Sequence, residues 1–179
     1  GGGAGRGVAG GGGGRGGHGL ACAVAATERG PRPRAAVWGV MLGRAHELEA
    51  LAGRASWPVG IGVSVTGTVG RRNGTVGFAP NLAWRHAEFG ETLAKLAAPD
   101  LPVVVGNDAD LAVLAEHSRG SGRDCDDLVY VIGRIGVGAG IIVNGSPLRG
   151  HDGHAREIGH NIVDRSGPAC PWRQRGCVA

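Results

Sequence analysis

The sequence places groups that could do chemistry in four short stretches. In the first, Asn107 and Asp108 follow the apolar run 101–105 and precede a helical pattern. In open α/β sheets, ligands bind outside the carboxyl ends of the strands, and a carboxylate such as Asp108 would be well placed there as a general base. Asn and Asp are also the commonest helix N-cap residues, and the spacing alone favours that structural role.

The second stretch is a glycine-rich turn between two apolar runs, with Gly133, Gly136, Gly138 and Gly140. Glycines let a backbone approach a phosphate closely and point several N–H groups at it. The alternative is a tight β-turn in which glycine supplies positive φ angles. Arg134 and Ile135 stand where a phosphate cradle prefers small or hydroxyl side chains, so the glycines alone are weak evidence for a phosphate site.

Hydrogen-bonding side chains are concentrated in the third stretch, residues 150–160. Glu157 and His160 are three residues apart, so on a helical turn they would face the same ligand. A carboxylate beside an imidazole suits a ligand with many hydroxyl groups. The three histidines of this stretch also allow a metal site, and a polar surface loop is the remaining alternative.

The fourth stretch carries two cysteines, Cys170 and Cys177, ten and seventeen residues after His160. Two thiolates and one imidazole would supply three of the four ligands that a structural zinc ion requires. A fourth ligand is not apparent in the sequence. Zinc with an incomplete ligand set and a pair of free thiols are therefore both open interpretations.

Apolar periodicity predicts the elements that must position these groups. Helices are expected at 39–54 and 89–97 and from Asn107 to Gly120, and strands at 59–65, 101–105, 128–132 and 137–143. The first of these strands has small residues between its β-branched ones, which predicts a strand covered on both faces. Asn144-Gly145 between apolar runs predicts a hairpin.

Glycine and charge are distributed unevenly over the 179 residues, which include 37 glycines and carry a formal charge of +4. Thirteen of the first 19 residues are glycine, and residues 1–34 hold five arginines against one acidic residue. Such a segment can bury little apolar surface, so we expect a disordered leader over 1–34. The change to consecutive strands near 121–126 divides the rest into a first α/β lobe, 35–122, and a partial second lobe, 123–179.

Several classes of protein are excluded by the pattern. The glycines lack the three-residue period of collagen. Apolar runs stay well short of the roughly 20 residues of a membrane-spanning helix, and the beginning of the chain lacks the apolar segment of a signal peptide. We therefore expect a cytoplasmic protein that has no contact with a membrane.

Taken together and in this order, the four stretches resemble the ROK family, named for repressors, open reading frames and kinases. The resemblance covers about residues 36–179 and rests on the segments 60–69, 79–84, 107–109, 136–142 and 157–160 with Gly176-Cys177. It implies an α/β protein with the actin-like, ribonuclease-H-like sugar kinase fold. The expected architecture is a first lobe and a truncated second lobe, with a sugar bound between them.

The resemblance also implies roles for single residues. Asn107, Asp108, Glu157 and His160 match positions that bind sugar hydroxyls in the family, and Asp108 matches the general base of its kinases. Family members hold one zinc ion with a histidine, matched by His160, and three cysteines, two of which are matched by Cys170 and Cys177.

Departures from the family pattern bear on the choice of function. Nothing between Gly19 and Trp38 resembles the family's Asp-x-Gly-Gly-Thr phosphate loop, and Arg134-Ile135-Gly136 replaces Gly-Thr-Gly in its second phosphate turn. In this degenerate phosphate loop Gly136, Gly138 and Gly140 remain. Trp172 stands where the middle zinc cysteine belongs.

These departures favour the sugar-binding effector domain of a ROK-type transcriptional regulator, without kinase activity. The alternative is a glucokinase-like ROK kinase that phosphorylates a hexose or N-acetylhexosamine, with Mg-ATP as donor and Asp108 as base. A remnant without a stable fold is a third reading. The expected partner is a small-molecule sugar. DNA would be a partner only with a winged helix supplied outside this chain, and a homodimer is left open.

Overall fold

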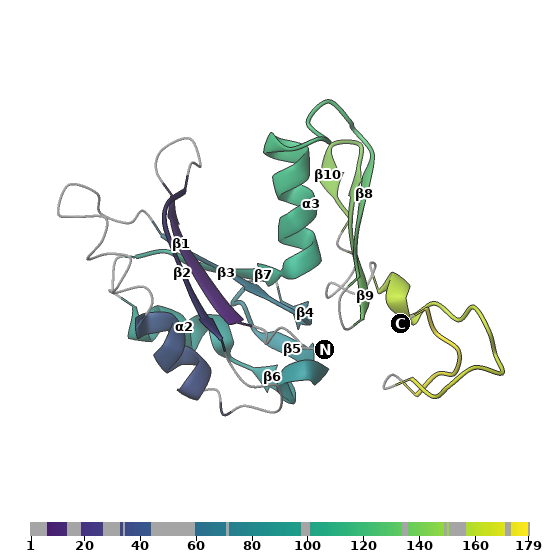
Figure 1. Ribbon diagram of the computed structural model, residues 1–179, viewed down its shortest axis with the longest axis horizontal. Coiled ribbons are helices and arrows are strands. Elements are labelled where there is room, and N and C mark those ends of the chain that lie inside the picture. The colour runs from purple at the N-terminus through teal and green to yellow at the C-terminus, as the bar shows by residue number, and fades with distance from the viewer. Residues whose placement is uncertain are drawn as a thin grey trace.

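The computed structural model describes residues 7–13, 19–26, 33, 35–43, 60–70, 72–97, 101–133, 136–148, 150, 157–170 and 173–178. Residues 35–43 are helical, and the further helices are α2 (Phe89–Leu96) and α3 (Asp108–Arg119), with 3-10 turns η1 (Pro80–Leu82) and η3 (Ile158–His160). Two groups of elements are visible: α2 with β3–β7 in one, and α3 with β8–β10 in the other (Figure 1). Among the described residues, no helix is long and apolar enough to span a membrane.

The strands form four small sheets. They are β1 (Gly7–Gly13), β2 (Gly19–Ala26), β3 (Ile61–Val65), β4 (Thr68–Val69), β5 (Val76–Ala79), β6 (Trp84–Ala87), β7 (Val103–Asn107), β8 (Leu128–Gly133), β9 (Val137–Val143) and β10 (Ser146–Pro147). Their order is β1-β2, β3-β7, β4-β5-β6 and β10-β9-β8. Only β3 and β7 pair in parallel; the other pairs among these described strands are antiparallel.

The expected disordered leader is wrong for two of its segments. Residues 7–13 and 19–26 pair as β1 and β2, with Gly7 opposite Ala26 and Gly11 opposite Cys22. A strand ladder is made of backbone hydrogen bonds, which glycine supplies as well as any other residue. The short apolar run 20–25 within the leader was a strand signal that the high glycine content concealed.

The parallel pair β3–β7 is the part of the fold that positions the first candidate site. Both strands were predicted, but β7 ends at Asn107, two residues later than expected. Val63 and Val65 of β3 are buried, whereas Gly62 and Ser64, which alternate with them, are exposed. The expectation that β3 is covered on both faces is therefore wrong for its described residues. Small residues fit a covered and an exposed face equally well, so they did not distinguish the two.

The core of the first group forms around Phe89 at the start of α2. Its ring stacks on Trp38 at a centroid distance of 6.2 Å and lies 5.1 Å from the ring of Trp84. Met41 and Leu42 pack against the same core, as the predicted apolar face requires. The rest of the predicted helix, residues 44–54, lies outside the described residues. The meander β4-β5-β6 was not predicted, because its strands have only two to four residues.

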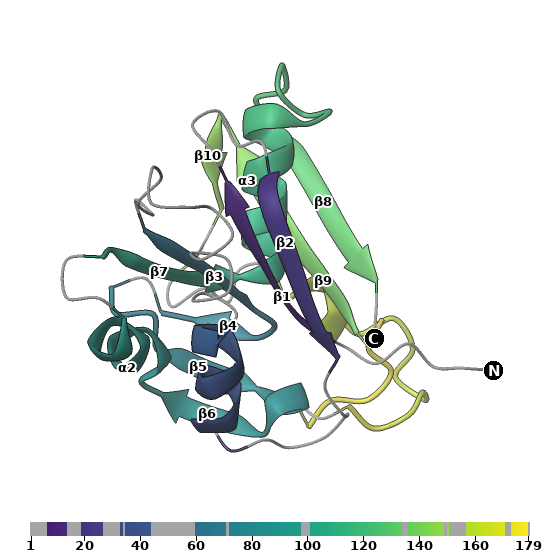
Figure 2. The same cartoon turned by 60° about the vertical axis from the view of Figure 1, so that its left-hand side comes forward.

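In the second group, α3 packs on the sheet β10-β9-β8 (Figure 2). The predicted strands and the hairpin are confirmed, with Asn144 and Gly145 at positive φ angles of 49° and 69°. Helix α3 also contacts β3 and β7, so it joins the two groups. A division of the chain after residue 122 remains a prediction.

Candidate functional site

The first candidate site lies at the carboxyl ends of β3 and β7. Val65 is opposite Asn107 in this parallel pair, so residues that follow each of them leave the sheet at the same edge. Two hydrogen bonds join the two strand ends. Asn107 Nδ2 donates to the Gly67 carbonyl over 2.9 Å, and Thr66 Oγ1 donates to Asp108 Oδ2 over 3.0 Å.

Asn107 is the N-cap of α3. Its Oδ1 accepts hydrogen bonds from the backbone N–H groups of Ala109 and Asp110, at 2.9 and 3.2 Å. The capping role favoured by the spacing is thereby confirmed. Since an amide nitrogen has two hydrogens and one is given to Gly67, Asn107 retains one N–H that could donate to a ligand.

Asp108 is the first residue of α3 and is half-buried. Its Oδ1 accepts from the N–H of Ala109 at 3.0 Å, while Thr66 holds Oδ2. Each carboxylate oxygen has a further lone pair, so the group can still accept a hydrogen bond from a ligand hydroxyl. Thr66 was not among the predicted site residues, because its contact with Asp108 depends on the pairing of β3 with β7.

The glycine-rich stretch meets α3 at its first turns. A side chain at Gly140 would collide with the Ala109 carbonyl and with Val113, and a Cβ at Gly138 would lie 3.3 Å from Ile132. Gly140 therefore allows β9 to approach the helix closely, whereas the tightest contact of Gly138 is with the neighbouring strand β8. Gly136 precedes β9 in a bend, and residues 134–135 of the predicted phosphate turn lie outside the described residues. Phosphate binding here stays a prediction.

Glu157 and His160 face each other across the 3-10 turn η3, as their spacing predicted. Glu157 Oε2 lies 3.9 Å from His160 Nε2, and their side chains are 32% and 23% exposed. Residues i and i+3 are eclipsed in a 3-10 turn, which brings these two side chains together. η3 contacts β9, and β9 also packs on α3 at Ala109 and Val113.

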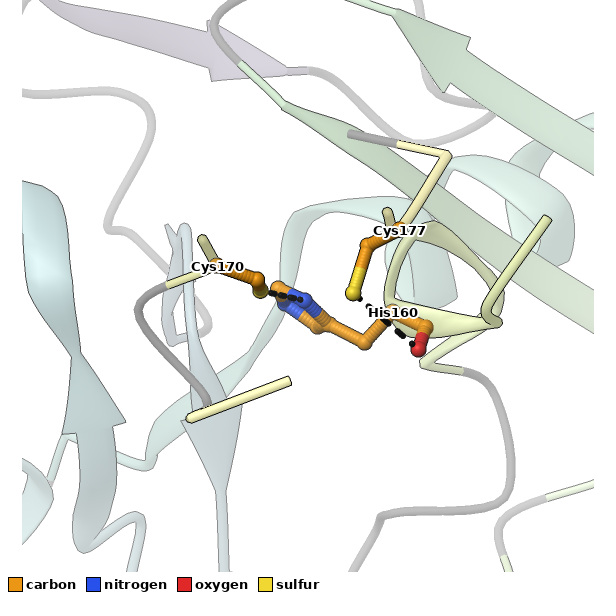
Figure 3. Close-up of side chains that lie close together, drawn as sticks. All are labelled: His160, Cys170 and Cys177. Atoms are coloured by element: carbon orange, nitrogen blue, oxygen red, sulfur yellow. Dashed lines mark hydrogen bonds between the residues drawn. The ribbon is translucent and has the colours of Figure 1, made fainter. Parts of the chain in front are cut away.

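His160 also lies between the two cysteines. Its Nδ1 is 3.2 Å from Cys170 Sγ, and Cys177 Sγ donates to the His160 carbonyl at 3.5 Å (Figure 3). One ligand atom from each residue lies within 4.8 Å of the others. Burial, then the hydrogen bond and the charge of Cys170, raise the pKa of the Cys177 thiol.

These three side chains fit part of a zinc site. Zn–S and Zn–N bonds of about 2.3 and 2.0 Å place tetrahedral ligand atoms about 3.5 to 3.8 Å apart, close to the spacing found. A carboxylate on the second imidazole nitrogen is the usual partner of a zinc-bound histidine, and Glu157 has that position. Within the described parts of the chain, no fourth histidine, cysteine or carboxylate joins the group.

Backbone pairing holds both cysteines in the cysteine loop, residues 161–170 and 173–178. Ile162 pairs with Cys177 and Ala169 with Arg175. The Arg173 N–H donates to the Cys170 carbonyl at 3.0 Å, and Arg173 has a φ of 61°, a conformation that favours glycine. This hydrogen bond holds Arg173 close to the first cysteine of the loop.

Comparisons with known proteins agree with the sequence resemblance. The sequence model of the ROK family matches residues 16–179. The glucokinase of Thermotoga maritima is 36% identical over 119 residues, which are 66% of this chain and 37% of the glucokinase. The xylose repressor of Caldicellulosiruptor bescii is 34% identical over 120 residues, which are 67% of this chain and 30% of the repressor. The chain thus spans about a third of each of these relatives.

Solved structures show the same two kinds of protein. A ROK family transcriptional regulator, a homologue of the Escherichia coli Mlc protein, has a TM-score of 0.77 and 28% identity, over 90% of this chain and 40% of its own. A ROK family glucokinase from Streptomyces griseus, in complex with glucose and AMPPNP, has a TM-score of 0.76 and 31% identity. The match covers 89% of this chain and 48% of the glucokinase. The predicted actin-like sugar kinase fold is confirmed. The family match begins at residue 16, twenty residues before the resemblance noted in the sequence.

Proposed function

Because the chain belongs to the ROK family, we propose that it is the sugar-binding part of a ROK-type transcriptional regulator and does not itself transfer phosphate. One observation carries the sugar-binding half of this proposal. Thr66 and the amide of Ala109 hold the half-buried Asp108 carboxylate at the carboxyl edge of the parallel strands. A fixed carboxylate with free lone pairs is suited to accept hydrogen bonds from sugar hydroxyls.

The regulator half is supported by the glycine-rich stretch. A sensor has to recognise only hydroxyl groups, whereas a kinase also has to cradle the phosphates of a nucleotide. Arg134 and Ile135 occupy the turn where small or hydroxyl side chains would suit phosphate. Gly140 is needed for the contact between β9 and α3, so its presence is explained without a nucleotide.

A ROK sugar kinase is the second candidate, and the position of Asp108 favours it. A carboxylate within hydrogen-bond reach of a sugar hydroxyl can take the proton as that oxygen attacks the γ-phosphate of Mg-ATP. The relative from Streptomyces griseus, solved with glucose and AMPPNP, binds both kinds of ligand.

The names of the relatives indicate which sugars to test first, namely glucose and xylose. N-acetylglucosamine and N-acetylmannosamine extend the series to N-acetylhexosamines. A sugar that binds the folded state raises the unfolding free energy by mass action, about 2.7 kcal/mol at one hundred times the dissociation constant. We expect one of these sugars to raise the melting temperature of the chain, and Glu157→Ala to reduce that rise.

The control is Glu91→Ala, which removes an exposed carboxylate in the first turn of α2. It should leave the sugar response intact. If no sugar of the series changes the melting temperature, the sensor proposal fails. If sugar and Mg-ATP together give ATP turnover that Asp108→Asn abolishes, the kinase proposal replaces the sensor proposal.

A further inference from the structure

We propose that the outer side of strand β8 is the surface through which two copies of this chain associate, by antiparallel pairing of β8 with β8 of the second copy. Such pairing would continue the sheet β10-β9-β8 across a two-fold axis into the second copy. Neither sugar nor nucleotide is needed for this association.

Strand β8 lies at the edge of its sheet. Among the described strands it pairs with β9 alone, and Figure 2 shows it on the outer side of that strand. It pairs residue by residue from Leu128 to Gly133, without a bulge. An edge strand presents unpaired backbone N–H and C=O groups, and proteins usually block further pairing there with a bulge, a proline or a charged side chain. The sequence Leu-Val-Tyr-Val-Ile-Gly of β8 has none of these features.

The outer face of β8 is apolar and open. Tyr130 is opposite Gly140, where an added Cβ would meet α3, so the even-numbered residues of β8 face the helix. Val129 and Val131 point away from the helix, and they are 59% and 56% exposed. A strand that is apolar on both faces is typical of one that is covered on both. The two valines therefore form a surface that a partner can cover.

The strand is complementary to itself in one antiparallel register. If Tyr130 of one copy lies opposite Tyr130 of the other, Val129 lies opposite Val131 of the second copy. The four valines then form one apolar cluster on the outer face, because directly opposite side chains contact each other in an antiparallel pair. A register shifted by one residue would place valines opposite residues that face α3, so the two outer faces would not be continuous.

Charge favours a second copy in the antiparallel direction as the occupant. Three exposed aspartates, Asp124, Asp126 and Asp127, precede β8, whereas the strand itself is uncharged. Parallel pairing would bring these acidic residues side by side, whereas antiparallel pairing places them at opposite ends of the joined strands. The same acidic residues disfavour nucleic acid or an acidic protein at this edge.

Sedimentation velocity of the 179-residue chain over a range of concentrations tests the association. We expect an equilibrium between monomer and dimer in which the dimer fraction rises with concentration. Val129→Glu and Val131→Lys each place a charge in the apolar cluster, so each should lower the dimer fraction while the circular dichroism spectrum stays the same. The control is Val104→Lys on β7, a valine that is 63% exposed and lies outside the proposed surface. It should leave the equilibrium unchanged.

A mixture of the two charged variants tests the register. With Tyr130 opposite Tyr130, the glutamate introduced at position 129 of one variant lies opposite the lysine introduced at position 131 of the other. The mixture should therefore recover dimer that neither variant forms alone. A mixture with no more dimer than the separate variants would contradict the register on which the proposal depends.

Hydrogen exchange of the wild-type chain locates the contact without any substitution. Amides of β8 should become more protected as the concentration rises and the dimer forms. A chain that stays monomeric at every concentration would overturn the proposal. So would assemblies larger than a dimer, or a dimer in which the protection of β8 does not change.

Discussion

The hydroxyl of Thr66 donates a hydrogen bond to the carboxylate of Asp108 over 3.0 Å, although 42 positions separate the two residues in the sequence. Their strands run in parallel with Val65 opposite Asn107, so the polar residues after each strand meet at one edge. This contact gives the proposed sugar-binding carboxylate a fixed orientation.

Replacement of Thr66 by valine keeps the shape of the side chain and removes the hydroxyl. Hydrogen bonds to charged groups stabilise proteins by about 1.5 to 3 kcal/mol. Because the bond from Thr66 to Asp108 is exposed, we expect its loss to lower the unfolding free energy by an amount at or below the lower end of that range. We expect Thr66→Val to weaken sugar binding as well, measured by calorimetric titration. Thr66→Ser restores the hydroxyl and should recover both properties; equal sugar affinity in the two variants would contradict the positioning role.

Asn107 should contribute to stability through both ends of its amide. Asn107→Ala removes the helix cap and the bond to Gly67, and loss of an N-cap typically costs about 1 kcal/mol. Asn107→Asp keeps an oxygen for the cap but loses the donor to the Gly67 carbonyl. Urea denaturation should rank the wild type as most stable, then Asp, then Ala. An Ala variant as stable as the wild type would exclude the capping contribution.

A methyl group at position 140 should disturb the contact between β9 and α3. It would meet the Ala109 carbonyl and Val113, and overpacking of this kind costs about 1 to 3 kcal/mol. The control is Gly133→Ala in the neighbouring strand β8, where no atom lies within 4 Å of an added Cβ. We expect thermal unfolding to show a loss for Gly140→Ala that is much larger than for Gly133→Ala. Similar losses would show that packing does not explain Gly140.

Stability in the cysteine loop should depend on pH through Asp164. The side-chain hydrogen bond from Ser166, followed by the backbone bond from the same residue, lowers the pKa of Asp164 below 3.8. A carboxyl with a lowered folded-state pKa stabilises the fold above its unfolded pKa, and this stabilisation is lost as pH falls through the folded value. The stability difference between the wild type and Ser166→Ala should therefore be constant near neutral pH and shrink below pH 3.8. A difference that grows on acidification would contradict this assignment.

The elements with strong periodicity were predictable from sequence. Apolar spacing located α2, and the breaks at Asn107 and Gly120 located α3. The β8–β9 pair was found from two apolar runs, and its link to β10 from Asn144-Gly145. The meander β4-β5-β6 could not be found this way, because a two-residue strand such as Thr68–Val69 has no measurable period.

The site was predictable in its residues but not in its contacts. Asn107 and Asp108 follow a recognisable strand, and Glu157 and His160 have helical spacing. The partner of Asp108 depends on the register of β3 against β7, which is set by tertiary packing of Val63 and Val65 and not by local sequence. Thr66 was therefore missed. The glycines of β9 suggested phosphate, whereas the packing role of Gly140 is visible only beside α3.

Calorimetric titration of the 179-residue chain with glucose, xylose and the two N-acetylhexosamines, without and with Mg-ATP, tests the central claim most directly. The proposal predicts saturable binding of one sugar molecule per chain, its loss in Asp108→Ala, and no consumption of ATP. Absence of binding for every sugar, or ATP turnover dependent on Asp108, would contradict it.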